Sequence, residues 1–289
     1  MRDTIDINSN DNALFITSQC NNRCVMCCQP PLLRNDLDGY FQKNKALIDS
    51  APRELRSLGI TGGEPTLLGD RLFELLRHIR TKLPETEIHL LTNGRAFADK
   101  EYARKLAECG EGKILLGVPL HADSAGDHDA ITQVKGSFEE TMLGLYNLGR
   151  YDIGIELRVV ITKMNYLRLP KLPDFIYRNL PFVEFISLMG LEYTGYTIKN
   201  RETVWIDPMD YQAELTQAVL ELRDWHMDVS IFNLPRCVLP EALWHFASKS
   251  ISDWKTQYLD ICRECTERPE CCGLFATSRM QSRGIKVIK

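Results

Sequence analysis

The sequence lacks several features that would assign it to a class at once. No apolar run approaches the length of a membrane span, and the first residues, Met1-Arg-Asp-Thr-Ile-Asp, lack the apolar core of a signal peptide. We therefore expect a cytoplasmic protein without a membrane partner. No internal repeat or low-complexity stretch is evident. The net charge of −4 gives no reason to expect a nucleic acid as partner.

What is present describes an ordinary globular protein with an unusual number of thiols. The 289 residues can bury a large core, which favours one domain with a small appendage. Hydrophobic residues make up 44% and charged residues 26% of the chain. Because the cytosol keeps thiols reduced, the ten cysteines argue for metal or cluster ligation over disulfides.

Apolar, β-favouring runs alternate with segments whose apolar residues recur at three- and four-residue spacing. The expected strands are 13–18, 57–61, 87–92, 113–120, 154–162 and 182–188, and a short strand-like run over 229–232 leads into Cys237. The expected helices are 71–83, 99–109, 137–148, 172–178 and, after the start signal Asp207-Pro208, 209–226. Six β–α repeats predict an α/β fold with a parallel sheet. Six units cannot close an eight-stranded barrel, so we predict a partial (β/α)6 TIM-like barrel with its ligands at the carboxyl ends of the strands.

The densest cysteine group, Cys20, Cys24 and Cys27 with Cys28 beside them, directly follows the first expected strand. Thiolates are soft ligands that suit zinc or an iron–sulfur cluster. The x3 and x2 spacing supplies three ligands, so a [4Fe–4S] cube held here would keep one iron free for an outside molecule. Zinc sites instead combine two separate cysteine pairs. A zinc knuckle, or thiols buried as small apolar groups, are the alternatives.

The second expected strand ends in Gly62, Gly63, Glu64 and Pro65. Two glycines expose backbone groups to close approach by a small molecule, and Glu64 adds an acceptor for a ligand's ammonium group. Alone, this tetrad also fits an ordinary turn. Combined with the cysteine loop, it resembles the radical S-adenosylmethionine (radical SAM) family, whose cluster motif is Cys-x3-Cys-x2-Cys and whose next strand carries Gly-Gly-Glu. The resemblance spans residues 13 to 289.

The resemblance implies that the free iron chelates the amino and carboxylate groups of S-adenosylmethionine, which one electron cleaves to a 5′-deoxyadenosyl radical. Arg158, inside an apolar strand, would bind the carboxylate, although a salt bridge to Glu156 is an alternative. His121 is either a ribose contact or a plain strand-end histidine. Further expected contacts to the cofactor are Asn93, Leu188, Gly190 and Met26, of which Met26 could equally be core filler.

A second cysteine group lies towards the C-terminus and consists of Cys237, Cys262, Cys265 and Cys271. It resembles the auxiliary-cluster domains of radical SAM enzymes, the SPASM and shorter twitch types. The resemblance implies a second [4Fe–4S] cluster with these four ligands, Cys272 being an alternative to Cys271. A structural zinc site is the other possibility. The predicted domains are a polar tail (1–12), a radical SAM partial barrel (13–226) and an auxiliary domain (227–289). Cys109 is expected to be a buried small hydrophobe.

The stretches 17–31, 235–244, 250–254 and 282–285 look like the His-Xaa-Ser system radical SAM maturases, C type. This likeness implies hydrogen abstraction from a ribosomally made precursor peptide, giving an oxidation or a cross-link. It also implies a second radical SAM protein as partner and an external electron donor of flavodoxin or ferredoxin type. The alternatives are a radical SAM enzyme acting on a small molecule and a non-catalytic iron–sulfur or zinc subunit. No general base can be named from the sequence.

Overall fold

Seven strands are hydrogen-bonded in the order in which they occur along the chain. The pairs β1–β2, β2–β3, β3–β4 and β6–β7 are parallel. The strands are β1 Ala13–Phe15, β2 Ser57–Thr61, β3 Glu87–Leu91, β4 Ile114–Pro119, β5 Gly154–Val160, β6 Phe185–Met189 and β7 Val229–Phe232. The predicted α/β class with a parallel sheet is confirmed. The sheet has one strand more than predicted, because the segment of β7 pairs with β6.

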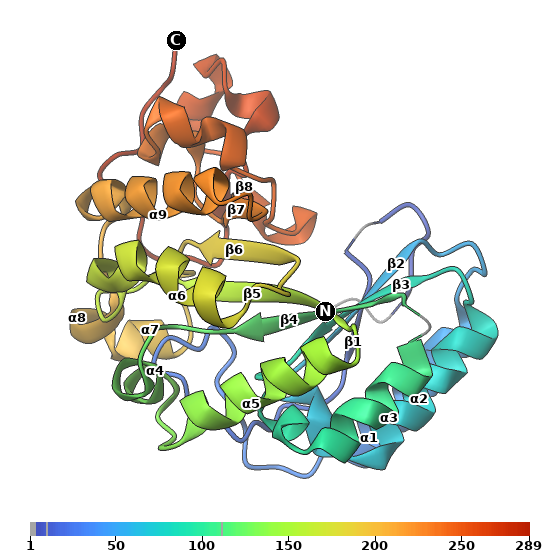
Figure 1. Cartoon of the computed structure of the whole chain (residues 1–289). Coiled ribbons are helices and arrows are strands. Elements are labelled where there is room, and N and C mark those ends of the chain that lie inside the picture. Colours follow the sequence, from blue (N-terminus) through green and yellow to red (C-terminus); the bar gives the residue numbers. More distant parts are fainter. Residues whose placement is uncertain (1–3, 10, 111) are drawn as a thin grey trace. The chain divides into compact units, whose positions relative to one another are not determined.

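This computed structural model describes residues 4–9, 11–110 and 112–289 (Figure 1). The first unit comprises Met1–Arg23, Pro30–Pro119 and Gly136–Glu156; the second comprises Cys24–Gln29, Leu120–Lys135 and Leu157–Lys289. Of the predicted N-terminal tail, residues 1–3 and 10 lie outside the described residues. At its end, the buried Asn12 donates from Nδ2 to the carbonyl oxygens of Asp6 and Ser9. No helix in the described part of the chain is long and apolar enough to cross a membrane.

Four helices of the first unit pack in sequence, α1 on α2, α2 on α3 and α3 on α5 (Figure 1). They are α1 Leu37–Ser50, α2 Asp70–Lys82, α3 Lys100–Gly110 and α5 Ser137–Arg150. α2, α3 and α5 agree with the predicted helices to within two residues at each end. α1 was not expected, because its buried residues are only Phe41, Ile48 and the polar Asn44. Asn44 Nδ2 donates to the carbonyl of Phe15, which ties α1 to β1.

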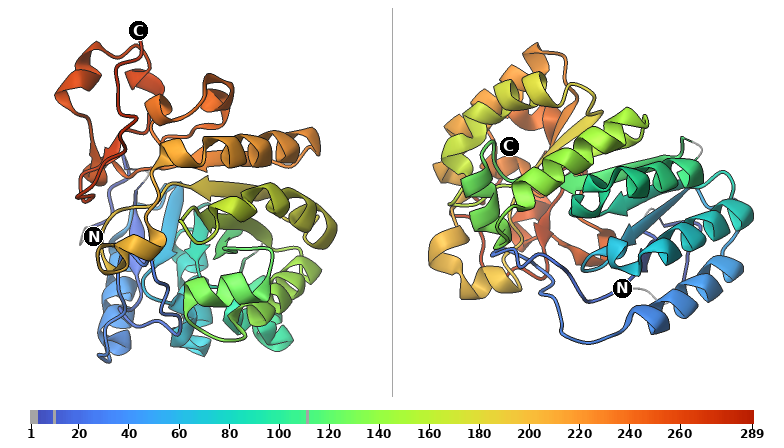
Figure 2. Two further views of the ribbon diagram at one scale, coloured as in Figure 1. Left: turned by 90° about the vertical axis from the view of Figure 1, so that its left-hand side faces the viewer. Right: turned by 60° about the horizontal axis from the view of Figure 1, so that its bottom comes forward.

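The second unit contains five α-helices among its described residues: α4 Ala125–Thr132, α6 Leu172–Asn179, α7 Tyr196–Lys199, α8 Arg201–Val204 and α9 Gln212–Asp224. α6 and α9 lie side by side (Figure 2). α9 begins three residues later than predicted, because Pro208–Asp210 forms a 3-10 turn whose N-cap Asp207 accepts from the Met209 N–H. Trp225 packs on Tyr177 with ring centroids 4.9 Å apart.

The cysteine-rich C-terminal region follows α9 and has little regular structure. It consists mainly of the 3-10 turns η5 Arg236–Val238, η6 Glu241–Phe246, η7 Asp253–Lys255, η8 Asp260–Glu264 and η9 Arg268–Glu270. Two antiparallel two-residue strands complete it, β8 Thr256–Gln257 and β9 Leu274–Phe275. Figure 2 shows this region (red) on the side of α9 away from α6. Far from it in the sequence, Cys109 is buried in α3, as predicted.

Candidate functional site

The Gly-Gly-Glu segment begins directly after β2 and supports the loop that carries Cys20. A Cβ atom at Gly63 would overlap the backbone of Gln19, so only glycine permits this approach. The Gly63 N–H donates to the Thr17 carbonyl at 2.6 Å, and the Glu64 N–H to the Gln19 carbonyl at 2.8 Å. The close approach that Gly63 allows is therefore to the protein's own backbone. Ligand binding by Gly62 and Gly63 stays a prediction.

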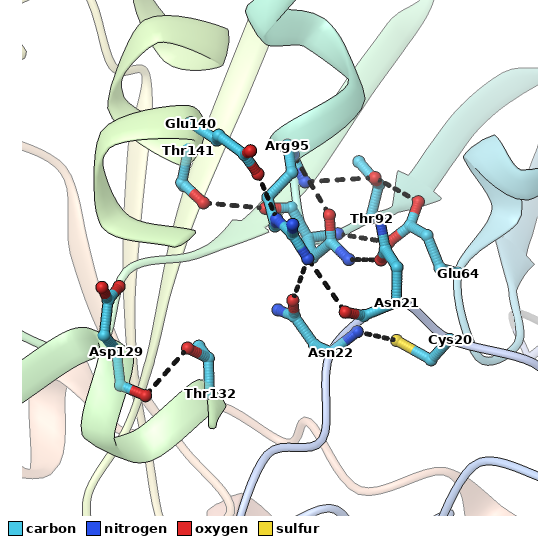
Figure 3. Close-up of polar contacts among 12 residues, drawn as sticks. Cys20, Asn21, Asn22, Glu64, Thr92, Arg95, Asp129, Thr132, Glu140 and Thr141 are labelled. Atoms are coloured by element: carbon cyan, nitrogen blue, oxygen red, sulfur yellow. Dashed lines mark hydrogen bonds and ion pairs between the residues drawn. The ribbon is translucent and has the colours of Figure 1, made fainter. Parts of the chain in front are cut away.

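The Glu64 carboxylate is fully buried and joins the ends of two strands (Figure 3). Its Oε1 accepts from the Thr66 N–H at 3.0 Å, the Thr66 hydroxyl at 2.8 Å and the Thr92 hydroxyl at 2.6 Å. Its Oε2 accepts from the Asn93 N–H at 2.7 Å. Burial raises the pKa of Glu64 against the opposing effect of these bonds. Glu64 thus organises the site, while its contact with a ligand's ammonium group stays a prediction. Pro65, also buried, begins the 3-10 turn η1 Pro65–Leu68.

The Cys20 thiol lies among polar groups from the same two strand ends. The Asn22 N–H donates to Cys20 Sγ at 3.3 Å, and the Asn93 side chain also bonds to this sulfur. Asn93 Nδ2 in turn donates to Asn21 Oδ1 at 2.6 Å. Burial raises the pKa of Cys20 to about 11, although the Asn22 bond opposes it. Asn93, predicted to contact the cofactor, is therefore placed beside a predicted cluster ligand.

Arg95 holds the cysteine loop to the helix layer, and sequence reasoning missed it. Its Nη1 donates to the Asn21 carbonyl at 2.9 Å and to Asn22 Oδ1 at 2.7 Å (Figure 3). Its Nε donates to Glu140 Oε2, on α5, at 2.6 Å. Its position just after the turn that closes β3 was the only available signal, since its partners are distant in the sequence.

Cys24 and Cys27 lie in a loop of the second unit that segment 195–200 holds in place. The Cys27 N–H donates to the Cys24 carbonyl at 3.0 Å, and the Tyr196 N–H to the Cys27 carbonyl at 2.9 Å. Gly195 has φ +57°, and a Cβ atom there would overlap the carbonyls of Cys27 and Cys28. The four-residue step from Cys20 to Cys24 keeps their Cα atoms within roughly 14 Å.

Met26 points away from the loop into an apolar cluster. It is 6% exposed and packs with Ile131 and Val204, with Cys24 at the edge of the cluster. Its carbonyl accepts from the Thr197 hydroxyl at 3.2 Å. This packing agrees with the alternative that Met26 is a residue of the hydrophobic core. Its contact with the adenine stays a prediction.

His121 is buried just beyond β4 and stacks on His128 with ring centroids 5.5 Å apart. The backbone N–H of His121 donates to His128 Nδ1 at 3.2 Å, and its backbone carbonyl accepts from Asn165 Nδ2 at 2.9 Å. Burial, together with His128, lowers the pKa of His121 to about 3, so the ring is neutral near pH 7. These contacts are those of a packed strand-end histidine, and its role as a ribose ligand stays a prediction.

The remaining predicted cofactor contacts lie on β5 and at the end of β6. Arg158 is half-buried in β5, while the alternative partner Glu156 has Oε2 2.8 Å from His89 Nε2. Leu188 is buried in β6. Gly190 directly follows that strand, and a Cβ atom there would overlap the Leu234 side chain. Their contacts with S-adenosylmethionine stay predictions.

The four predicted C-terminal ligands line one cavity of about 380 Å³ in the second unit. Cys237 and Cys262 lie in η5 and η8, Cys265 ends η8, and Cys271 ends η9. Cys272 is buried and lies outside this lining. Across the described part of the chain, no three or more His, Cys, Asp or Glu side chains are grouped so that they could hold a metal ion.

The surroundings of this cavity shift the pKa of its thiols in opposite directions, and burial raises the pKa of Cys237. A hydrogen bond from the Cys272 thiol lowers the pKa of Cys271 to about 6, against burial and with help from backbone N–H groups. Arg236 lines the cavity and pairs with Glu267 at 2.5 Å. Arg268 stacks over the Tyr258 ring at 5.0 Å, and the Tyr258 hydroxyl donates to the Cys271 carbonyl at 2.8 Å.

Known proteins similar to this chain share its fold and part of its sequence. An Fe-coproporphyrin III synthase from Methanosarcina barkeri is 33% identical over 60% of this chain and 43% of its own length. The chain spans less than half the length of the first curated relatives it matches. The crystal structure of Streptococcus suis SuiB bound to S-adenosylmethionine matches 79% of this chain and 52% of its own, with 17% identity and a TM-score of 0.61.

The structure of anSMEcpe with AdoMet and the Kp18Cys peptide matches 76% of this chain and 62% of its own, with 20% identity and a TM-score of 0.57. At these identities the two structures show a shared fold. The family model described as the Radical SAM superfamily matches residues 14–174, more than half of the chain and both sequence motifs around Cys20 and Glu64. The chain therefore belongs to the radical SAM superfamily.

Proposed function

We propose that this chain is a radical SAM maturase that modifies a ribosomally made precursor peptide. Membership of the superfamily implies S-adenosylmethionine and a [4Fe–4S] cluster. We assign Cys20, Cys24 and Cys27 as the cluster ligands, because three thiols within eight residues match its donor set. When bound, this pair supplies a 5′-deoxyadenosyl radical that abstracts hydrogen from an unactivated C–H bond.

The chain's own residues position the reacting groups. Glu64 fixes the ends of β2 and β3 relative to each other, and Arg95 fixes the loop of Cys20 on them. We assign Arg158 to the carboxylate of S-adenosylmethionine and His121 to its ribose. A neutral His121 suits a hydroxyl partner, since one of its nitrogens donates and the other accepts. Holding the substrate carbon against the radical is then the task of the surrounding pocket.

A second [4Fe–4S] cluster, in a twitch-like domain over residues 227–289, is part of this proposal. The observation that supports it best is the single cavity lined by Cys237, Cys262, Cys265 and Cys271. Cations around the cavity, Arg236 among them, offset the negative charge of four thiolates. Such a centre would take the second electron of an oxidation or a cross-link. Zinc would use the same ligands, so metal content decides between them.

A peptide substrate is supported by the anSMEcpe structure, which holds a peptide. The finer proposal is a C-type maturase of the His-Xaa-Ser system in the cytoplasm. It would act with a second radical SAM protein and an electron donor of flavodoxin or ferredoxin type. The stretches 17–31 and 235–244 support this assignment.

Anaerobic reconstitution with iron and sulfide tests the proposal. About eight iron atoms per chain are expected, and 5′-deoxyadenosine should form when S-adenosylmethionine and a strong reductant are added. Cys24→Ala should abolish this product, whereas the matched variant Cys28→Ala should retain it. With a His-Xaa-Ser peptide and the partner protein, mass spectrometry should show the loss of two hydrogens. The proposal fails if wild-type and Cys24→Ala proteins behave alike.

A small-molecule substrate is the second candidate, because the 33%-identical relative is named as a porphyrin-forming synthase. Two results together would support a small-molecule substrate. The reconstituted protein would leave every peptide unchanged, alone and with its partner, and it would cleave S-adenosylmethionine faster when a tetrapyrrole is added. Peptide modification would decide against it.

A further inference from the structure

A second cavity lies in the second unit at the carboxyl ends of two strands. Leu191 comes two residues after β6, and Asn233 and Leu234 come directly after β7. Its opposite wall is formed by the C-terminal segment, including Phe275 and Met280. Carboxyl ends of parallel strands are where α/β folds place their ligands.

This cavity adjoins the four-cysteine cavity of the second unit and shares Leu191 with the surroundings of the Met26 cluster. On one side, Leu191 packs against the apolar cluster that contains Met26 and Cys24. On the other side, Pro235, Leu274 and Ile285 line both this cavity and the one with the four thiols. Those three side chains therefore separate it from the cavity with the four thiols.

The lining is uncharged and rich in aromatic rings. Among the described residues that line the cavity, none is Asp, Glu, Lys, Arg or His, and three are Trp205, Tyr211 and Phe275. Burial raises the pKa of Tyr211, so its phenol stays neutral. The Ser278 hydroxyl already accepts from the Tyr193 N–H at 2.9 Å, and the Ser282 hydroxyl donates to an Asp207 oxygen at 2.6 Å. A charged group would lose its hydration here and would meet only neutral polar groups, such as those of Asn233 and Gln281.

We propose that this cavity is the substrate pocket and that it takes an uncharged, aromatic-sized side chain of the peptide. The inference rests on the proposed function and names the class of side chain that the site selects. Trp205 and Phe275 supply rings that an aromatic guest packs against.

Ligand-observed NMR on the full-length protein tests the pocket without turnover. The probes are N-acetyl-phenylalaninamide, N-acetyl-lysinamide and N-acetyl-aspartamide, measured by saturation transfer. We expect saturable binding of the phenylalanine probe and none of the two charged ones. Met280→Trp, which fills the cavity, should weaken phenylalaninamide binding about tenfold or more. The adjacent Arg279→Trp is the matched control, because Arg279 is exposed and does not line the cavity.

Equal binding of the three probes would overturn the proposal, as would undiminished binding by a Met280→Trp protein with a wild-type circular dichroism spectrum and melting temperature. If Met280→Trp does not fold, Phe275→Asp and the exposed control Ala276→Asp replace the pair. The parallel assay for 5′-deoxyadenosine keeps the two proposals apart. Wild-type protein that cleaves S-adenosylmethionine but binds no probe refutes the pocket alone, and the reverse result refutes the proposed function alone.

Discussion

The site around Cys20 and the four-cysteine cavity are built in opposite ways. Around Cys20, the ends of β2 and β3 meet, and Glu64 is satisfied by four hydrogen bonds from Thr66, Thr92 and Asn93. The C-terminal thiols instead lie in short 3-10 turns or directly follow them. The first site is ordered by the sheet. In the second, the described turns η8 and η9 bury none of their own residues, so we expect the order of this site to depend on what the thiols bind.

Metal removal is the strongest test of this contrast. Structural metal sites stabilise small domains by on the order of 10 kcal/mol, because the bound state is the folded state. Chelation of the reconstituted protein should therefore expose residues 236–275 to hydrogen exchange and proteolysis. The network of Glu64 and Thr92 should keep its protection, since β2 and β3 hold it. Equal loss of protection in both regions would contradict the contrast.

Cys271 and Cys272 give the sharpest comparison within the second site. Cys271 lines the cavity, whereas the neighbouring Cys272 lies outside the lining and donates to the Cys271 sulfur. Cys271→Ala should lower the iron content from about eight to about four atoms per chain. Cys272→Ala should keep about eight and shift the reduction potential of the auxiliary cluster, because hydrogen bonds to ligating sulfurs tune it. Iron analysis and a redox titration followed by EPR measure both effects. The reverse iron contents would make Cys272 the ligand.

Glu64 tests how firmly the sheet holds the first site. Glu64→Ala leaves donors of Thr66, Thr92 and Asn93 buried without an acceptor, and we expect a loss of about 3–5 kcal/mol in the free energy of unfolding. Glu64→Gln keeps the shape and one carbonyl oxygen, so a loss of about 1–2 kcal/mol is expected. Chemical denaturation with a fluorescence readout measures both. A Glu64→Ala protein as stable as wild type would show that the network does not organise the strand ends.

The parts of the fold that sequence reasoning predicted are those with strong local signals. α2 buries Leu72, Leu75, Leu76 and Ile79, a spacing that is visible in the sequence. α1 lacks such a stripe because a buried polar residue, Asn44, takes one of its core positions. β7 is only four residues long. Its pairing with β6 depends on the tertiary structure, and no local sequence pattern indicates it.

In the candidate site, too, the features with local sequence signals were predicted and those that depend on distant residues were not. The motifs at Cys20 and Gly63 were visible because their chemistry is local. The partners of Glu64 were not, since Thr92 and Asn93 lie 28 and 29 residues away and are brought near by strand register. Arg95 was missed for the same reason, because Glu140 is 45 residues away.

Substitution of Asp36 should have the smallest effect on stability. It tests whether contacts to Thr17 and Ser18, just before Cys20, hold the cysteine loop in place. The Asp36 carboxylate accepts from the Thr17 hydroxyl at 2.5 Å and from the Ser18 hydroxyl. Burial would raise the pKa of Asp36, but bonds from Ser18, Thr17 and Arg34 outweigh it and lower the pKa to about 2. Asp36→Ala should lower the free energy of unfolding by about 2 kcal/mol at pH 7.

The pH dependence of that loss distinguishes a charged partner from simple packing. The pKa of an unfolded aspartate is about 3.9, above the folded value, so the contribution of Asp36 is fully present above about pH 4 and is lost as pH falls through about 2. The stabilities of wild type and Asp36→Ala should therefore converge between pH 4 and pH 2. Asp38→Ala is the control, since its side chain is 79% exposed and should change stability by less than about 1 kcal/mol. A difference that stays constant down to pH 2 would mean that Asp36 acts by packing and leaves the loop of Cys20 held by Gly63 and Arg95 alone.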